Sequence, residues 1–109
     1  EEVAATATSL YLLTGVRISR AKLAAKIMAE FEKYYAIYLE TQDLSGVMNE
    51  YNCHLVNRGR SVRVLDPRKE YTGVAQGINQ NGELLVQTED GTAHVSSGEV
   101  SVRGVYGYV

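Results

Sequence analysis

The sequence predicts an α+β protein in which N-terminal helices are followed by a small SH3-like β-barrel. Three observations lead to this fold class. Before Gly59, apolar residues recur every three or four positions, as on one face of a helix. After Arg60 they recur at every second position, as in strands, and glycine-containing turn pairs divide this part into short segments. We therefore expect two parts, a helical one over residues 1–59 and a barrel over residues 60–109.

Composition limits the kinds of protein that this chain can be. Its 109 residues (12.0 kDa) suffice for one ordinary domain or two very small ones, and they are too few for a large enzyme. The chain is 45% hydrophobic but has no uninterrupted apolar run of about 18 residues, so we expect no transmembrane helix and no membrane partner. The net charge of −2 provides no overall positive field that would attract nucleic acid.

The cysteine content and the first residue bear on location and origin. Cys53 is the single cysteine and has no partner for an internal disulfide. Because no secretory leader is visible either, the sequence predicts a cytoplasmic protein. The chain begins at Glu1 rather than at a methionine, so we expect it to be a fragment of a longer protein.

Two short helices are predicted on either side of a long one. The first covers Val3–Leu13 and ends at Gly15, which can adopt the left-handed conformation that closes a helix. The other begins after Asp43 or Ser45, either of which can cap it, and runs through Val56.

The long amphipathic helix is predicted over Ser19–Glu40, with Ser19 as its N-cap. On its charged face Lys26 and Glu30 stand one turn apart, and we expect them to form a weak ion pair. The apolar face would be exposed in a chain without a partner domain, so we expect the isolated chain to self-associate. This face comprises Leu23, Ala24, Ile27, Met28, Phe31, Tyr34, Tyr35 and Tyr38.

Five short strands are predicted in the second part. Between them, Asn81-Gly82 and Asp90-Gly91 are the residue pairs that type I′ hairpin turns prefer. So many short strands in so few residues cannot form a broad open sheet, which is why we expect them to curl into a small barrel. The strands are expected at residues 62–66, 71–79, 83–88, 92–96 and 99–103.

Residues that commonly carry chemistry do not form a metal or catalytic motif. Cys53 and His54 are adjacent, and His94 is the only other good ligand, so neither a Cys-x-x-Cys nor a His-Glu-x-x-His spacing occurs. The glycines do not form a phosphate-binding loop at the start of a helix. We therefore predict no metal site and no catalytic residue in this chain.

Two charged features are open to more than one interpretation. A basic stretch from Arg58 to Lys69 could meet phosphates or could guard an edge strand against aggregation. Further on, Glu99 and Arg103 stand four residues apart and would share one face of a strand, either as a surface ion pair or as part of a site. The basic stretch contains Arg58, Arg60, Arg63, Arg68 and Lys69 against one acid, Asp66.

Several short motifs occur in a recognisable order. They are Ala7-Thr8-Ser9-Leu10, Gly73-Val74-Ala75-Gln76-Gly77-Ile78, Gly82-Glu83-Leu84-Leu85-Val86 and Gly98-Glu99-Val100-Ser101-Val102-Arg103. Together they make the chain resemble the C-terminal part of biotin protein ligases, also called biotin–[acetyl-CoA-carboxylase] ligases, over nearly all of its length.

The resemblance implies an activity for a longer parent enzyme. In that family a class II synthetase-like catalytic domain joins biotin to ATP, which binds with Mg²⁺, and passes biotin from biotinyl-5′-AMP to a lysine of biotin carboxyl carrier protein. Residues 1–59 would be the last helices of that domain and residues 60–109 its SH3-like neighbour. The family's Gly-Arg-Gly-Arg loop and catalytic lysine do not occur in this sequence, so the fragment alone would be inactive.

The resemblance also assigns two residues and one conditional partner. Glu99 and Arg103 match the Glu and Arg of the family's small domain, which face the ATP or adenylate. Some members are transcription repressors through an N-terminal winged helix. A DNA operator is therefore a partner only if the parent carries such a domain.

An autonomous SH3-like module that binds a peptide or RNA through Arg58–Lys69 is the alternative. Salt-dependent RNA binding that is lost when Arg60 and Arg63 become alanine would favour it.

Overall fold

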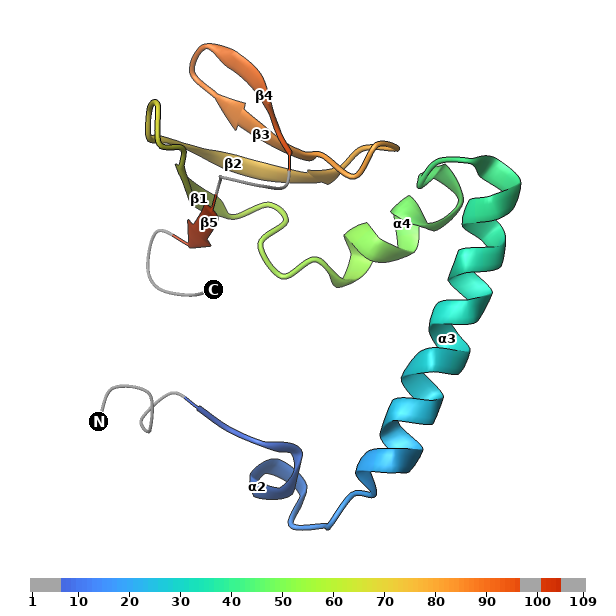
Figure 1. The fold of residues 1–109 in the computed structure, drawn as a ribbon. Coiled ribbons are helices and arrows are strands. Elements are labelled where there is room, and N and C mark those ends of the chain that lie inside the picture. The colour runs from blue at the N-terminus through green and yellow to red at the C-terminus, as the bar shows by residue number, and fades with distance from the viewer. Residues whose placement is uncertain (1–6, 97–100, 105–109) are drawn as a thin grey trace. The chain divides into compact units, whose positions relative to one another are not determined.

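The computed structural model describes residues 7–96 and 101–104 and confirms the α+β class. The chain divides into two compact units, Glu1–Tyr35 and Ala36–Val109, and one helix, α3, contributes residues to both. Within the described residues, helices precede an antiparallel sheet (Figure 1). The elements are α2 (Leu10–Thr14), α3 (Arg20–Thr41), α4 (Ser45–His54), β1 (Ser61–Leu65), β2 (Tyr71–Ile78), β3 (Leu84–Thr88), β4 (Gly91–Val95) and β5 (Ser101–Gly104).

The five strands form one antiparallel sheet in the order β4-β3-β2-β1-β5. The first four strands are consecutive hairpin neighbours, whereas β5 returns to pair with β1, so that Val64 lies opposite Val102. This SH3-like arrangement matches the predicted strands to within two residues at each described end.

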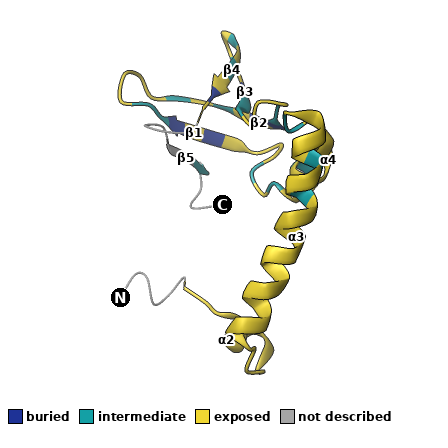
Figure 2. Cartoon of the chain, turned by 45° about the vertical axis from the view of Figure 1, so that its right-hand side comes forward, coloured by how far each residue is buried: buried dark blue, intermediate teal, exposed yellow. Residues whose placement is uncertain are grey.

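The core of the sheet is small and made of short aliphatic side chains. Alternation along β1 buries Val62 and Val64 completely and leaves Ser61 and Arg63 exposed. Figure 2 shows the buried residues confined to the sheet. Each fully buried valine contributes on the order of 1.5 kcal/mol. The buried set is Val62, Val64, Ala75, Val86 and Val95, with Tyr71, Leu84 and Ala93 packed against it.

Two glycines of β2 are required by close approach of other chain segments. A Cβ atom at Gly73 would lie 2.5 Å from the carbonyl oxygen of Gln87 on β3. At Gly77, where φ is +128°, a Cβ atom would lie 2.7 Å from Oδ1 of Asn52. The register with β3 shifts between Ala75 and Gly77, which is a β-bulge. Glycine at position 77 therefore allows both the bulge and the approach of α4.

The turns fall where the sequence predicts them, but their type I′ assignment is wrong. In the β2–β3 turn the positive φ belongs to Gly82 alone, not to Asn81. The reason is Asn79, whose Oδ1 accepts hydrogen bonds from the backbone N–H groups of Asn81 and Glu83, each at 3.0 Å. The Asn79 side chain favours a turn whose two central residues have negative φ. Only the residue that follows these two, Gly82, is then left-handed.

The β3–β4 turn departs from type I′ in the same way. Its central residues, Glu89 and Asp90, have negative φ, and Gly91 takes the positive value of 124°. The Thr88 hydroxyl donates a hydrogen bond to the Gly91 carbonyl at 2.8 Å. This bond across the turn comes from a residue outside the predicted Asp90-Gly91 pair.

The first helix is shorter than predicted. Helix α2 begins at Leu10, because Ser9 is extended and its hydroxyl oxygen accepts a hydrogen bond from Leu12 N–H at 3.2 Å. It ends at Gly15 in the left-handed conformation, as predicted. Residues 3–6 of the predicted Val3–Leu13 helix lie outside the described part of the chain.

The long helix is confirmed, and its start follows the prediction. Ser19 caps α3 by accepting a hydrogen bond from Lys22 N–H at 3.3 Å. The predicted pair of Lys26 with Glu30 is wrong, since Glu30 instead contacts Lys33 with a separation of 2.6 Å between Nζ and Oε1. Both side chains of this pair are more than half exposed, so it contributes little stability.

The third helix ends earlier than predicted. Helix α4 stops at His54, and Leu55 is already extended with ψ of 105°, so Leu55 and Val56 lie beyond it. The predicted cap at Asp43 or Ser45 is wrong, because the N-cap residue is Leu44 and it makes no side-chain capping hydrogen bond. Asp43, one residue earlier, accepts a hydrogen bond from Ser45 N–H at 2.8 Å. Hydrogen bonds from Ser45 also hold the pKa of the Asp43 carboxyl below its usual value.

Helix α4 is attached to the sheet by side-chain amide and backbone hydrogen bonds. The Asn52 amide donates to the Ile78 carbonyl at 3.1 Å and accepts from the Ile78 N–H at 2.7 Å. Just beyond the helix, Gly59 N–H donates to the Ala75 carbonyl at 2.7 Å. The Asn52 amide thereby pairs with β2 as the backbone of a neighbouring strand would.

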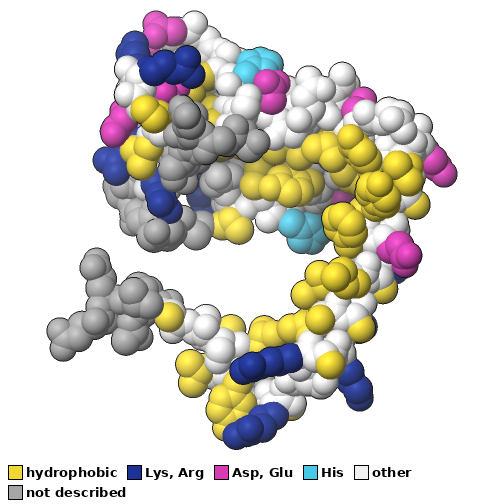
Figure 3. Space-filling view, in the orientation of Figure 1, with side chains coloured by type: hydrophobic (Ala, Val, Ile, Leu, Met, Phe, Trp, Pro, Cys, Tyr) yellow, Lys and Arg dark blue, Asp and Glu magenta, His cyan; other side chains and the backbone are white. Residues whose placement is uncertain are grey.

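The apolar face of α3 is exposed, as the sequence predicts for a chain without a partner domain. No residue of α3 is buried, and Phe31, which stacks on Tyr35 with 6.0 Å between ring centroids, remains 64% exposed. Figure 3 shows apolar side chains gathered along this helix. Leu23, Ile27, Met28, Phe31, Tyr35, Tyr38 and Leu39 are its exposed large apolar residues. None of the described helices is long and apolar enough to cross a membrane.

Candidate functional site

The candidate site residue that the structure describes is Arg103. It lies on β5, directly opposite Arg63 on β1. Because Val62 and Val64 on either side of Arg63 point into the core, Arg63 points to the outer face of the sheet. Directly opposite residues of an antiparallel pair share a face, so the half-buried Arg103 belongs to that outer face as well.

The other predicted site residue, Glu99, lies outside the described residues. The pairing of Glu99 with Arg103 therefore stays a prediction.

The basic residues of the stretch Arg58–Lys69 do not form one continuous surface, because they have different partners. The Arg58 guanidinium donates to the Gln76 carbonyl at 3.1 Å and to the Asn52 carbonyl at 3.4 Å, which attaches it to the junction of α4 and β2. Arg68 stands 3.5 Å from Asp66. Arg63 alone is placed beside Arg103, and the sequence by itself did not single out this neighbour.

A second polar cluster, which sequence reasoning missed, lies at one end of the β3–β4 hairpin. Glu83 Oε2 accepts a hydrogen bond from Asn79 at 2.7 Å and lies 3.1 Å from His94 Nδ1. The hydrogen bond from Asn79, followed by that from His94, lowers the pKa of the Glu83 carboxyl. These contacts satisfy Glu83 internally, so the cluster stabilises the hairpin rather than forming a binding site.

The candidate metal ligands do not come together. Cys53 is exposed, and His54 Nδ1 lies 3.0 Å from the Glu50 carbonyl one turn back on α4. His94 belongs to the sheet. In the described ranges, no three His, Cys, Asp or Glu side chains are grouped so as to hold a metal ion.

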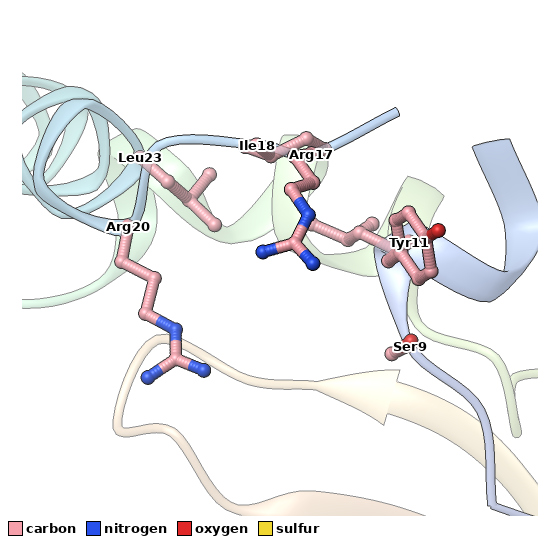
Figure 4. A pocket seen from close by; sticks show the side chains of 7 residues that line it. Ser9, Tyr11, Arg17, Ile18, Arg20 and Leu23 are labelled. Atoms are coloured by element: carbon pink, nitrogen blue, oxygen red, sulfur yellow. The ribbon is translucent and has the colours of Figure 1, made fainter. Parts of the chain in front are cut away.

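The N-terminal unit has an open hollow of about 500 Å³ between α2 and the start of α3. Figure 4 shows Arg17 and Tyr11 among the side chains that line it, and Cζ of Arg17 lies 5.9 Å from the centroid of the Tyr11 ring. The segment from Val3 to Ala29, which contains the lining residues, has four Lys or Arg residues and no Asp or Glu. The hollow is lined by Ser9, Leu10, Tyr11, Arg17, Ile18, Arg20 and Leu23.

Comparison with known proteins shows what this chain is similar to. Residues 59–103 match the family model described as "Biotin protein ligase C terminal domain". A solved structure, "Apo structure of Biotin protein ligase from Aquifex aeolicus", superimposes on 95% of the chain with a TM-score of 0.80 and 25% sequence identity. The chain is therefore similar to biotin protein ligases in its last part and in its fold.

Other biotin protein ligases agree with this assignment. "Biotin protein ligase from Aquifex aeolicus in complex with biotin and ATP" matches with the same TM-score of 0.80 and 25% identity. The "Bifunctional ligase/repressor BirA" proteins of Bacillus spizizenii and Bacillus subtilis are each 28% identical over 102 residues, which is 94% of this chain.

The region that matches is the C-terminal part of these ligases. The chain spans 31% of the length of the two Bacillus relatives and 46% and 44% of the two Aquifex chains. The comparisons thus confirm the resemblance that the sequence motifs indicate, and the fold.

Proposed function

We propose that this chain is the C-terminal part of a biotin protein ligase, which adenylates biotin with ATP and transfers it to a lysine of biotin carboxyl carrier protein. The match of residues 59–103 to the family's C-terminal domain is the observation that carries the proposal. The chain alone is expected to be inactive, because its sequence contains neither the family's Gly-Arg-Gly-Arg loop nor its catalytic lysine.

Within that enzyme, the SH3-like domain presents Arg103 to the phosphates of ATP or of the adenylate. A guanidinium can donate two parallel hydrogen bonds to phosphate oxygens and offset the negative charge that develops as pyrophosphate leaves. Arg103 sits on a strand that is paired along its length with β1, so its backbone is held in place. In this proposal Glu99 orients the Arg103 guanidinium, and Mg²⁺ accompanies ATP.

The partners and location follow from the same proposal. Biotin carboxyl carrier protein, biotin and ATP would be bound mainly by the catalytic domain, in the cytoplasm. Repression of transcription at a DNA operator would require a separate DNA-binding domain in the parent.

The role of Arg103 can be tested in a full-length biotin ligase that carries this chain as its C-terminal part. A chimera with the Aquifex aeolicus enzyme is suitable because the folds superimpose over 95% of the chain. Changing Arg103→Ala should slow formation of biotinyl-adenylate by about a hundredfold, an effect typical of losing one charge-stabilising donor. Arg68→Ala, which removes an exposed arginine elsewhere, is the matched control. A normal rate and a normal KM for ATP in the Arg103→Ala enzyme would refute this role.

A further inference from the structure

The β2–β3 turn contains a residue pair that can modify itself. Asn81 is the only asparagine of the sequence that a glycine follows, and both residues of the pair are exposed. In such a pair the backbone nitrogen of the glycine can attack the side-chain amide of the asparagine, because glycine has no side chain to hinder the approach. The sequence and the exposure therefore make Asn81 a candidate for spontaneous deamidation.

The reaction needs only water as a co-reactant. The Gly82 nitrogen forms a bond to Cγ of Asn81 and the bond from Cγ to Nδ2 breaks, so that the NH₂ group leaves as ammonia with the proton of the Gly82 N–H. Water then opens the resulting succinimide ring at one of its two carbonyl carbons. Opening at Cγ gives aspartate. Opening at the backbone carbonyl carbon gives isoaspartate, whose main chain is longer by one carbon atom.

In the closed turn the Gly82 nitrogen is not free to react. Its N–H donates a hydrogen bond to the Asn79 carbonyl at 3.0 Å. The Asn79 side chain also holds both neighbours of this glycine, since Oδ1 accepts hydrogen bonds from the N–H groups of Asn81 and Glu83, each at 3.0 Å. Attack therefore requires local opening, and its rate is the rate in the unfolded chain multiplied by the fraction of turns that are open.

The same turn is attached to the start of α4. Leu44 N–H donates a hydrogen bond to the Gln80 carbonyl at 2.8 Å, and Figure 1 shows the β2–β3 turn beside the connection between α3 and α4. The Leu44 side chain also reaches Gly82, where an added Cβ atom would lie 3.0 Å from Leu44 Cδ1. The backbone conformation of this turn therefore determines whether α4 keeps its contact.

A longer main chain at position 81 is incompatible with this conformation. The turn is closed by a hydrogen bond from Asn79 N–H to the Glu83 carbonyl at 3.0 Å, together with the two bonds that Asn79 Oδ1 accepts. An extra backbone carbon between these residues changes their spacing, so the bonds cannot all form. The new carboxylate also stands two residues before that of Glu83 and repels it.

We propose that Asn81 is a modification site that deamidates when the contacts of Asn79 open, and that isoaspartate at this position releases the start of α4 from the sheet. Asn79 thereby sets the rate at which the chain is modified. The proposal does not depend on the biotin ligase function, because it uses only residues of the β2–β3 turn and Leu44.

The first test follows deamidation of the folded 109-residue chain at mildly alkaline pH, with mass spectrometry to locate the modified residue. Asn79→Ala should speed the reaction at Asn81 by about tenfold or more, because it removes both bonds that Oδ1 accepts. Gln80→Ala is the matched control, because it changes an exposed side chain of the same turn and keeps the backbone carbonyl that Leu44 uses. It should leave the rate unchanged.

Hydrogen exchange separates local opening from global unfolding. In the Asn79→Ala variant, exchange of Gly82 N–H should rise by the same factor as the rate of deamidation. Exchange of Ala75 N–H, which is bonded to the Arg60 carbonyl, should rise much less. If both amides change equally, the variant unfolds globally, and Asn79→Ser, which keeps a shorter acceptor, replaces it in the same comparison.

The second test concerns α4. The isoaspartate form, separated from the original chain by ion exchange, should show faster exchange of Leu44 N–H. The Asn81→Asp variant adds the charge without lengthening the main chain, so its effect on Leu44 N–H should be smaller.

Three results would overturn the proposal. Earlier modification of another asparagine would mean that the site is wrong. Equal rates of deamidation in the folded chain and in the chain unfolded by urea, or in the Asn79→Ala variant and the original chain, would mean that Asn79 does not control it. Unchanged exchange of Leu44 N–H in the isoaspartate form would mean that the modification does not reach α4.

Discussion

The SH3-like sheet and the long helix α3 use apolar residues in opposite ways. The sheet buries Val62, Val64 and Val86 completely, and helix α4 is attached to it by Asn52. Helix α3 has the better periodicity in sequence, yet none of its residues is buried. The comparison teaches that an amphipathic pattern predicts a helix and an apolar face, but not whether this chain supplies the surface that covers it.

The largest expected effect comes from placing the same charged residue in both regions. Val64→Glu should lower the free energy of unfolding of the sheet by about 4 kcal/mol or more, because it puts a carboxylate into the core. Ile27→Glu, on the exposed face of α3, should change it by less than about 0.5 kcal/mol. Urea unfolding monitored by circular dichroism measures both. If the two variants lose similar stability, the contrast between the regions is wrong.

A smaller loss is expected where α4 joins the sheet. Asn52→Ala removes both hydrogen bonds to the Ile78 backbone and should cost about 2 kcal/mol. Asn49→Ala, at an exposed position of the same helix, is the control and should be close to neutral. The free energies of unfolding can be compared in the same urea experiment. Equal stability of the two variants would mean that the Asn52 contacts do not hold α4 to the sheet.

The exposed face of α3 should drive self-association of the isolated chain. The double change Ile27→Glu and Phe31→Glu should raise the dissociation constant of the self-associated form by about tenfold or more, because it removes apolar contact area. Lys26→Gln on the charged face should have little effect. Equilibrium sedimentation gives both constants, and a chain that stays monomeric at high concentration would contradict the prediction.

The smallest expected effect is on the stability of the β3–β4 hairpin at low pH. The folded-state pKa of Glu83 is lowered, so its contribution to stability is present above the unfolded-state pKa of about 4.3 and is lost as the pH falls through the folded-state pKa. Glu83→Gln should therefore be less stable than the original chain near pH 6, with the difference disappearing near pH 3. Thermal unfolding at several pH values measures this.

A control and a contrary outcome complete the acid experiment. Glu89→Gln removes the same charge from the exposed β3–β4 turn and should show no such convergence. If the difference in stability between the original chain and the Glu83→Gln variant stays constant with pH, the contacts of Glu83 do not depend on its charge.

Periodicity and turn residues were enough to predict the element order, the strands and the extent of α3. Local geometry was not predictable, because it depends on side chains outside the predicted motif. Asn79 determines the β2–β3 turn from outside the Asn81-Gly82 pair, and Ser9 delays the start of α2.

The sequence provides a candidate site residue but not its neighbours. Motif resemblance proposes Arg103, and nothing in the spacing of Arg63 and Arg103 reveals that they are neighbours, since 39 intervening residues separate them in the sequence. That proximity is a consequence of β5 returning to pair with β1. Contacts between strands that are distant in sequence need the register, which a single sequence does not provide.

The Asn52 contact with β2 also makes one backbone amide a reporter for the junction. Because Ile78 N–H is bonded to a side chain of α4 rather than to a strand, its exchange with deuterium depends on whether α4 is in place. Ala75 N–H, which bonds to the Arg60 carbonyl, provides an internal reference on the same strand. The ratio of these two exchange rates would follow the release of α4 in solution, without a label and without any change to the sequence.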